Sequence, residues 1–209
     1  MPRSITIDDL YLFKQISRPR ISPDGQQVAY VVTTIDKSTQ KYCSSIWISS
    51  VDSGDARRFT GGASNAHSPC WSPDGKNIAF TGGLKTHSGG HLDLYTISAH
   101  MEHGSATCLS HDFEGTFQDW TNSDIGDEHL SPPPSWSQDG RTLYALASHR
   151  GASRIYAITA SGSGDQMKYR VILNEYQAQF KGLLWVQHAY LIAPGFSEPQ
   201  SIVGVHCNT

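Results

Sequence analysis

Apolar and polar positions repeat along this chain with a long period. Three segments begin with a large apolar residue and Ser-Pro-Asp-Gly or Ser-Gln-Asp-Gly, and each continues into an apolar run; they are 21–30, 71–80 and 136–145. The aspartates of the motif, Asp24, Asp74 and Asp139, lie 50 and 65 positions apart, which gives a unit of about fifty residues with one insertion. A fixed period of this length predicts a repeat architecture.

Each unit continues with two further apolar segments in the same order. The first has a central aromatic residue and covers 46–48, 94–97 and 155–158. The second is shorter and ends in a large apolar residue followed by a small polar one, at Phe59-Thr60, Leu109-Ser110 and Leu173-Asn174. Short apolar segments between turn residues are typical of β-strands, and the simplest count is four strands per unit.

The repeated motif has the chemistry of a tight turn. Proline presets φ at the first corner, aspartate bonds to its own backbone, and glycine accepts the positive φ that closes the turn. In the third copy Gln138 replaces proline, but Asp139 and Gly140 remain, so we expect the turn to form there as well. Because Asp24 and Asp74 occupy the same turn position as Asp139, we interpret all three as structural residues rather than catalytic carboxylates.

The strand after each turn is apolar at successive positions, as in 28–32, which indicates a strand covered on both faces. Four-stranded units in series, each covering its neighbour, are typical of a β-propeller. The sequence therefore predicts an all-β fold, a partial β-propeller of about four four-stranded blades preceded by one short helix. The predicted blades are approximately 21–60, 70–110, 134–174 and 182–209, and the last is incomplete. A β-sandwich is the alternative, but a sandwich does not need the same turn in every unit.

Two segments lie outside the repeats. Residues 5–16 are predicted to form a helix, because Thr6 can cap it and apolar residues follow one side. We assign residues 1–20 to this helix and a linker, and residues 21–209 to the partial propeller. The second segment is an insertion over 111–134, which is rich in Asp and Glu and ends in three prolines.

The composition limits the classes of partner that the chain is expected to bind. Its 209 residues contain 16 Lys and Arg against 19 Asp and Glu, a formal net charge of −3, whereas binding to a nucleic-acid backbone needs a basic surplus. No apolar run approaches the length of a membrane span, and we see no signal peptide. We therefore expect no nucleic acid and no membrane as partners, and a cytoplasmic location. The four cysteines, Cys43, Cys70, Cys108 and Cys207, form no Cys-x-x-Cys pair and are expected to be free thiols.

Aromatic residues recur once per unit, at Trp47, Tyr95 and Tyr156 in the strands and at Trp71 and Trp136 before the turns. This periodicity indicates packing residues that are repeated with the blade. A base-stacking surface is the alternative, but the charge balance does not supply the phosphate contacts that it needs.

The sequence offers no complete catalytic motif. An α/β-hydrolase nucleophile lies in a Gly-x-Ser-x-Gly turn, because small neighbours let the strained turn expose the hydroxyl. The nearest match, 195–199, has Pro199 where the second glycine belongs, and no helix pattern follows. We therefore interpret Ser197 as a loop residue and assign no catalytic residue. Without a nucleophile, the ten histidines have no general-base role to fill.

Metal binding is the next possibility. Histidines and a cysteine gather at His87, His91, His100, His103, Cys108 and His111. Their spacing invites a zinc site, but they lie in Gly/Ser-rich loops and no cysteine pair anchors them. The stretch 86–140 contains nine acidic residues and no Lys or Arg, so calcium or a basic peptide end are candidate ligands. The ligand spacing of an EF-hand loop is not found in its most acidic part, which contains Asn122, Asp124, Gly126, Asp127 and Glu128. We expect solvated loops and assign no metal and no cofactor.

These motifs resemble the N-terminal propeller of the prolyl oligopeptidase family of serine peptidases, in particular its acylaminoacyl-peptidase and dipeptidyl-aminopeptidase-like branch. The resemblance rests on the recurrent Trp-Ser-Pro-Asp-Gly units and on 7–13, where the predicted helix leads into 16–25. Segments 121–126 and 134–151 look like the beginning of the third blade in that family. The turn motif by itself is shared with TolB-like propellers, and we expect blades of that type.

The resemblance implies a propeller that covers an α/β-hydrolase domain, with the Ser-Asp-His triad in the part that follows it in sequence. We therefore expect a non-catalytic propeller fragment, truncated before the catalytic domain, of an enzyme that hydrolyses peptides with acylaminoacyl or dipeptidyl release. Such a propeller restricts large folded substrates, contributes one wall of the peptide site and packs on the hydrolase domain through its helix.

The expected partners are thus the C-terminal α/β-hydrolase domain and, in the intact enzyme, a peptide substrate. The unfinished blade also leaves unpaired strand edges, which permit self-association. The alternative function is a stand-alone TolB-like binding module that closes its ring by oligomerisation.

Overall fold

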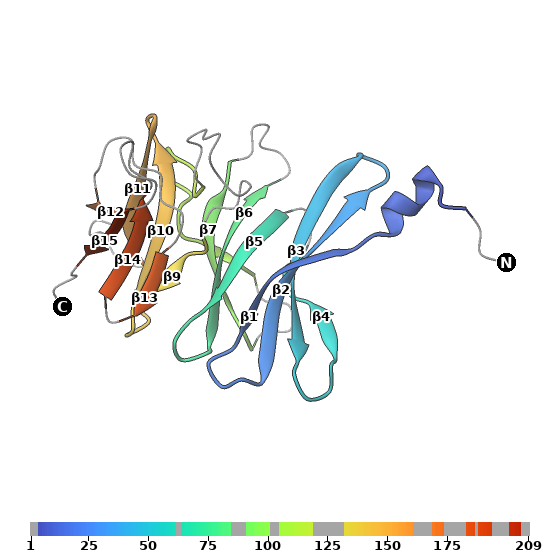
Figure 1. Cartoon of the computed structure of the whole chain (residues 1–209), viewed down its shortest axis with the longest axis horizontal. Helices are drawn as coiled ribbons and strands as arrows, with labels where there is room; N and C mark the ends of the chain where they lie inside the picture. The colour runs from blue at the N-terminus through green and yellow to red at the C-terminus, as the bar shows by residue number, and fades with distance from the viewer. Residues whose placement is uncertain are drawn as a thin grey trace.

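The computed structural model describes residues 4–61, 64–84, 91–100, 105–118, 132–160, 169–173, 183–186, 188–193 and 201–205. Within these residues the chain forms four antiparallel sheets in chain order, preceded by one short helix (Figure 1). In each sheet, strands that follow one another in sequence are hydrogen-bonded neighbours. Each sheet is therefore a simple meander, which is the connectivity of a propeller blade.

The first three blades contain four strands each. Blade 1 consists of β1 (Gln15–Ile21), β2 (Gln27–Asp36), β3 (Lys41–Ser50) and β4 (Ala56–Arg58). Blade 2 consists of β5 (Ser64–Trp71), β6 (Asn77–Leu84), β7 (Asp93–Ser98) and β8 (Thr107–Cys108). Blade 3 consists of β9 (Ser135–Trp136), β10 (Thr142–His149), β11 (Ala152–Thr159) and β12 (Tyr169–Leu173). The fourth sheet has three described strands, β13 (Leu183–Val186), β14 (His188–Ala193) and β15 (Ser201–Val205).

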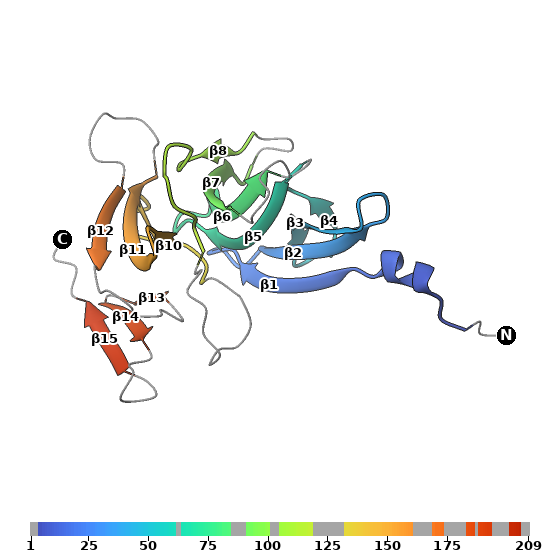
Figure 2. The same cartoon turned by 90° about the horizontal axis from the view of Figure 1, so that it is seen from above.

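The blades lie side by side and fan out around their first strands (Figures 1 and 2). The first strands of neighbouring blades are in contact, β1 with β5, β5 with β9 and β9 with β13. The arrangement is an all-β, unclosed propeller preceded by one short helix, which confirms the fold class predicted from the repeat. The prediction of four strands per unit is confirmed in blades 1 to 3.

The N-terminal helix is shorter than predicted. The expected helix over 5–16 is a 3₁₀ helix, η1 (Ile7–Leu12), which projects from blade 1 (Figure 2). Thr6 donates from its backbone N–H to Asp9 Oδ2 at 2.7 Å, as a helix-initiating residue does. No apolar partner covers the helix in the described part of the chain, and from Gln15 onwards the backbone pairs with β2 instead. Strand pairing satisfies backbone groups that a short, unsupported helix leaves exposed.

The hydrophobic core lies between the blades. One cluster joins blades 1 and 2 and contains Ala29, Ile46, Ile48, Phe59, Ala66, Trp71, Ile78, Phe80, Ile97 and Ala99. A second cluster joins blades 2 and 3 and contains Ala79, Leu94, Leu109, Phe117, Trp136, Leu143, Ala145, Ala147, Tyr156 and Ile158. Blade 2 contributes to both clusters, which explains why its strand β6 is apolar at successive positions.

Candidate functional site

The repeated turns have one hydrogen-bonding pattern in all three copies. The hydroxyl of the turn serine donates to Oδ1 of the turn aspartate, at 2.5 Å in blade 1 and 2.6 Å in blades 2 and 3. The same carboxylate oxygen accepts the backbone N–H two residues further on, at 3.0–3.1 Å. The serines, Ser22, Ser72 and Ser137, are buried. Each turn is thus closed by a serine and an aspartate that are fully engaged with each other.

These contacts also set the ionisation of the turn aspartates. The hydrogen bond from the serine hydroxyl, followed by the backbone N–H, holds the pKa of Asp24, Asp74 and Asp139 below the ordinary value for aspartate. A lowered pKa keeps the carboxylate charged and suits an acceptor rather than a proton donor. The geometry explains the three aspartates as turn residues.

Tryptophans before the turns join neighbouring blades. The indole Nε1–H of Trp71 in blade 2 donates to the carbonyl oxygen of Arg20 in blade 1 at 3.0 Å. The indole Nε1–H of Trp136 in blade 3 donates to the carbonyl oxygen of Cys70 in blade 2 at 3.1 Å. Arg20 and Cys70 are equivalent, because each precedes the residue before its own turn serine. We call the residue directly before the turn serine the clamp position. It is Ile21 in blade 1, Trp71 in blade 2 and Trp136 in blade 3.

The turns of neighbouring blades also lie close together. A side-chain carbon added at Gly75 of blade 2 comes within 3.6 Å of Pro23 in the turn of blade 1. The same carbon at Gly140 of blade 3 comes within 3.9 Å of Pro73 in the turn of blade 2. Both glycines have a φ of +70°, which favours glycine for conformational reasons as well. The motif therefore serves its own turn and the contact with the next blade.

The small polar residue that ends the shorter apolar segment also has a defined role. Thr60 accepts the backbone N–H of Ile46 at its hydroxyl oxygen, at 2.9 Å. Ser110 accepts the backbone N–H of Leu94 in the same way, at 2.8 Å. In both blades this hydroxyl pairs a buried N–H on the third strand, which would otherwise lack a partner at the end of the short fourth strand. Asn174, the third member of the pattern, lies outside the described residues.

The predicted packing role of the aromatic residues holds where the side chains are described. Trp71, Trp136 and Tyr156 are buried, and Tyr95 stacks on Phe80 with ring centroids 5.3 Å apart. Trp47 of blade 1 is only half-buried. The aromatic residues of blades 2 and 3 therefore lie in the interfaces between blades.

The candidate metal ligands do not gather in the described residues. There, no three His, Cys, Asp or Glu side chains come together as a metal site. His91 lies 3.4 Å from Asp93, and His111 lies 3.8 Å from Asp112, both as side-chain pairs. His87, His103, the acidic residues 122–128 and Ser197 lie outside the described residues.

Three of the four cysteines are described, and none of the three is in a disulfide. Burial raises the pKa of Cys70 to about 11, so its thiol stays protonated at neutral pH. Burial also raises the pKa of Cys108. Neither thiol has the lowered pKa of a reactive cysteine.

A proline that the repeat pattern above does not include recurs three residues before each turn serine, at Pro19, Pro69 and Pro134. Pro69 and Pro134 are fully buried. In blades 1 and 2 the residue before this proline, Arg18 or Ser68, has a positive φ of 53° or 54°, and the pairing with the next strand shifts there. A left-handed conformation in a non-glycine residue costs about 1 kcal/mol or more. The strand pairing on either side of the residue must offset this cost.

The insertion after blade 2 also contains unforeseen core residues. Phe113 contacts the rings of Phe117, His149, Tyr156 and Tyr169, with centroids 5.0–5.5 Å apart. Two aromatic residues four positions apart in an acidic segment were the available signal. The described start of this insertion is therefore packed onto blade 3.

The fold and the repeated interfaces define a class, the TolB-type β-propeller. The fold is similar to that of TolB from Acinetobacter baumannii, with a TM-score of 0.61, 16% identity, and 94% of this chain and 42% of that chain covered. It is equally similar to acylaminoacyl peptidase from Pyrococcus horikoshii, with a TM-score of 0.61, 18% identity, and 95% of this chain and 32% of that chain covered. The β-propeller domain of the trilobed protease from Pyrococcus furiosus gives a TM-score of 0.54 at 20% identity, with 87% of this chain and 49% of that chain covered.

Sequence similarity points to peptidases. The chain is 29% identical over 148 residues to the uncharacterized peptidase YuxL of Bacillus subtilis, which covers 71% of this chain and 20% of that protein. It is 31% identical over 80 residues to dipeptidyl-peptidase 5 of Porphyromonas gingivalis, which covers 38% of this chain and 11% of that protein. No protein-family model matches. These relatives and structures confirm the resemblance found in the sequence, which is to the N-terminal propeller of the prolyl oligopeptidase family of serine peptidases. The chain spans a fifth or less of the length of these two relatives.

In the part of the chain that the structure describes, no helix is long and apolar enough to cross a bilayer.

Proposed function

We propose that this chain is the non-catalytic propeller region of a serine peptidase that hydrolyses peptides with acylaminoacyl or dipeptidyl release. The observation that carries the proposal is the similarity over 148 residues to a peptidase of which this chain spans only 20%. The described blades support it, since their turn serines and aspartates are engaged in holding the turns. We infer two roles for the propeller, restricting access of large folded substrates and packing on a C-terminal α/β-hydrolase domain.

The N-terminal segment supports the packing role. Its apolar side chains are strongly exposed, and the fractions are 85% for Ile5, 80% for Ile7, 71% for Leu12 and 62% for Phe13. The helix contacts blade 1 at β2, and Asp8 forms an exposed ion pair of 2.8 Å with Lys37. A helix that lies beside blade 1 and presents an apolar surface suits a domain that packs against it.

The first test is the reading frame downstream of codon 209. We expect an in-frame Gly-x-Ser-x-Gly motif there, followed by an aspartate and a histidine. The 209-residue chain and the longer product are then assayed with acylated-peptide and aminoacyl chromogenic substrates. We expect turnover by the longer product alone. Turnover by the 209-residue chain that disappears in Ser197→Ala contradicts the proposal, and a discrete even-numbered oligomer with no downstream hydrolase favours a stand-alone binding module.

The two roles are tested in the longer product. A peptide of about ten residues and the same sequence displayed in a folded protein are offered as substrates, and only the free peptide is expected to be cleaved. Leu12→Asp is expected to weaken packing of the propeller on the hydrolase domain and to lower its thermal midpoint. Tyr42→Asp serves as a matched control, because Tyr42 is 69% exposed near the start of β3. Equal effects of the two substitutions contradict the packing role.

A further inference from the structure

The first strands of blades 1 and 2, β1 and β5, contact each other and contain the same irregularity. The regular pairing of β1 with β2 is interrupted between Ser17 and Arg20, and that of β5 with β6 between His67 and Cys70. Such a bulge redirects a side chain away from the regular pleat and is over-represented beside functional sites. The first strands of propeller blades line the central channel of the ring. The two bulges therefore lie on the inner side of the fan.

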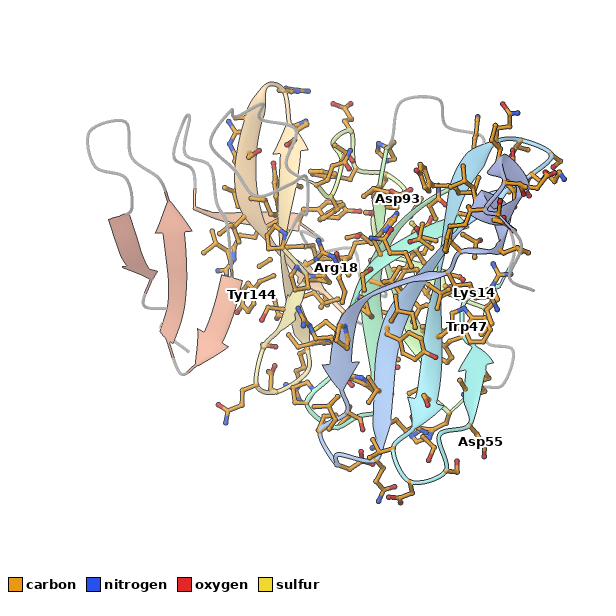
Figure 3. All side chains as sticks on the ribbon, turned by 45° about the vertical axis from the view of Figure 1, so that its right-hand side comes forward. Lys14, Arg18, Trp47, Asp55, Asp93 and Tyr144 are labelled. Carbon is orange, nitrogen blue, oxygen red and sulfur yellow. The ribbon has the colours of Figure 1, made fainter. Side chains whose placement is uncertain are left out.

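Three basic side chains gather at these bulges. Arg20 pairs with Ala29, which is buried in the cluster that joins blades 1 and 2, so the Arg20 side chain lies on the side of blade 1 that faces blade 2. Burial, and after it the nearby charge of Arg20, holds the pKa of Arg18 below its ordinary value. Burial, and after it the nearby charge of Arg18, does the same to the pKa of His67 in β5. Arg18 is thus close to both Arg20 and His67. In the view of Figure 3, Arg18 lies in the middle of the molecule.

The two strands carry only positive charge in a chain whose formal net charge is −3. Neither β1 nor β5 contains Asp or Glu, and their one further ionisable group, the Cys70 thiol, stays protonated because burial raises its pKa to about 11. Two guanidinium groups that lie close together repel each other, and an anion bound between them relieves the repulsion. The inner side of blades 1 and 2 is therefore electrostatically suited to an anionic group.

Arg20 is the part of this cluster that a ligand can reach. Its side chain is exposed, and one guanidinium nitrogen donates to the carbonyl oxygen of Pro19 at 3.1 Å. Among the described residues Arg20 forms no ion pair, so its other N–H groups are left to bond an incoming acceptor. A guanidinium presents these groups as a planar fork that matches the two oxygens of a carboxylate.

We propose that Arg18 and Arg20 of β1, with His67 of β5, form a carboxylate-binding site on the innermost strands of blades 1 and 2. A peptide carries this group at its C-terminal end and in the side chains of Asp and Glu. The choice of a peptide as the source of the carboxylate rests on the proposed function, whereas the site itself rests on the three basic side chains.

Peptide binding to the 209-residue chain, followed by NMR, tests the site. The probes are N-acetylated tetra-alanine with a free C-terminal carboxylate, the same peptide with a C-terminal amide, and an amidated peptide with one internal glutamate. We expect the free acid to bind and to shift the ring signals of His67, and the amide of tetra-alanine not to bind. Binding of the glutamate peptide as well assigns the site to any carboxylate, and its failure to bind assigns the site to the end of the chain. Equal binding of acid and amide, binding of neither acidic peptide, or tighter binding of inorganic phosphate overturns the proposal.

Arg20→Gln locates the site. It removes the exposed fork and is expected to weaken binding of the free acid about tenfold or more, the effect of one charge-assisted hydrogen bond. Arg20→Lys keeps the charge without the fork and should weaken binding less. Arg170→Gln is the matched control, because it removes the same charge from an exposed position on β12, the outermost strand of blade 3. Equal losses in Arg20→Gln and Arg170→Gln contradict a site at Arg20. Circular dichroism checks that each variant is folded, and the comparison of acid with amide decides the matter in the unsubstituted chain.

Peptidase turnover by the longer product is scored separately from binding. A 209-residue chain that binds the free acid but has no downstream hydrolase refutes only the proposed function. A longer product that cleaves peptides while its propeller binds acid and amide equally refutes only the carboxylate site.

Discussion

The indole N–H of Trp71 in blade 2 donates a hydrogen bond to the carbonyl oxygen of Arg20 in blade 1, and this bond links the two blades. Trp71→Phe keeps an aromatic ring in the core but removes the N–H donor. The net value of such a hydrogen bond is about 1 kcal/mol, and removing the donor of a part-buried hydrogen bond costs about 1–3 kcal/mol. The smaller ring also gives up roughly 40 Å² of buried apolar surface, about 1 kcal/mol. We therefore expect the free energy of unfolding to fall by about 2–3 kcal/mol.

Trp47→Phe is the matched control for this prediction. Trp47 also donates its indole N–H, to Ser45 Oγ at 3.2 Å, but the bond stays within blade 1 and the ring is half-buried on the face of the sheet opposite to Ile46 and Ile48. Because water can reach that face, we expect a loss of about 1 kcal/mol or less. Urea unfolding followed by circular dichroism gives both values from the midpoints at constant slope. If Trp71→Phe costs no more than Trp47→Phe, the indole does not couple the blades and the reasoning fails.

Three further predictions concern the blades themselves. Gly115→Ala is expected to lower stability by about 1–3 kcal/mol, because its new carbon would lie 2.5 Å from the carbonyl oxygen of Ser148, and thermal unfolding measures the loss. Thr60→Val removes the acceptor of the buried Ile46 N–H and should cost about 1–3 kcal/mol in urea unfolding, whereas Thr60→Ser should cost less than 1 kcal/mol. The turn aspartates, whose pKa is lowered in the fold by the serine hydroxyl, add stability that is fully present above their ordinary pKa of 3.8 and lost as the pH falls through the folded values. Unfolding midpoints measured from pH 5 to pH 2 should therefore fall, and Asp74→Asn should flatten the fall; a variant as steep as the parent contradicts this assignment.

The strands and turns were predictable because their signals are local. Ser-Pro-Asp-Gly closes its turn through atoms within five residues of one another, and the same local contacts recur in each copy. The N-terminal helix was predicted wrongly in its bounds for a related reason. Its apolar periodicity is real, but Ile7 and Leu12 have no described surface to pack on, and the pairing of Gln15 with Thr33 takes over the following backbone. A periodicity indicates which side of an element is apolar, not whether a partner covers it.

The contacts that join the blades could not be read from the pattern, because they connect residues 51 and 66 positions apart. The sequence showed Trp71 and Trp136 as repeated aromatic residues, and both a core role and an indole donor role are compatible with that repetition. The donor role became visible only when the carbonyls of Arg20 and Cys70 were placed beside them. Once it is known, the departure of Ile21 from the pattern acquires a meaning that the sequence alone did not give it. An isoleucine at a tryptophan position is unremarkable as a core substitution, but at the clamp position it removes the polar contact that the other two units make to the blade before them.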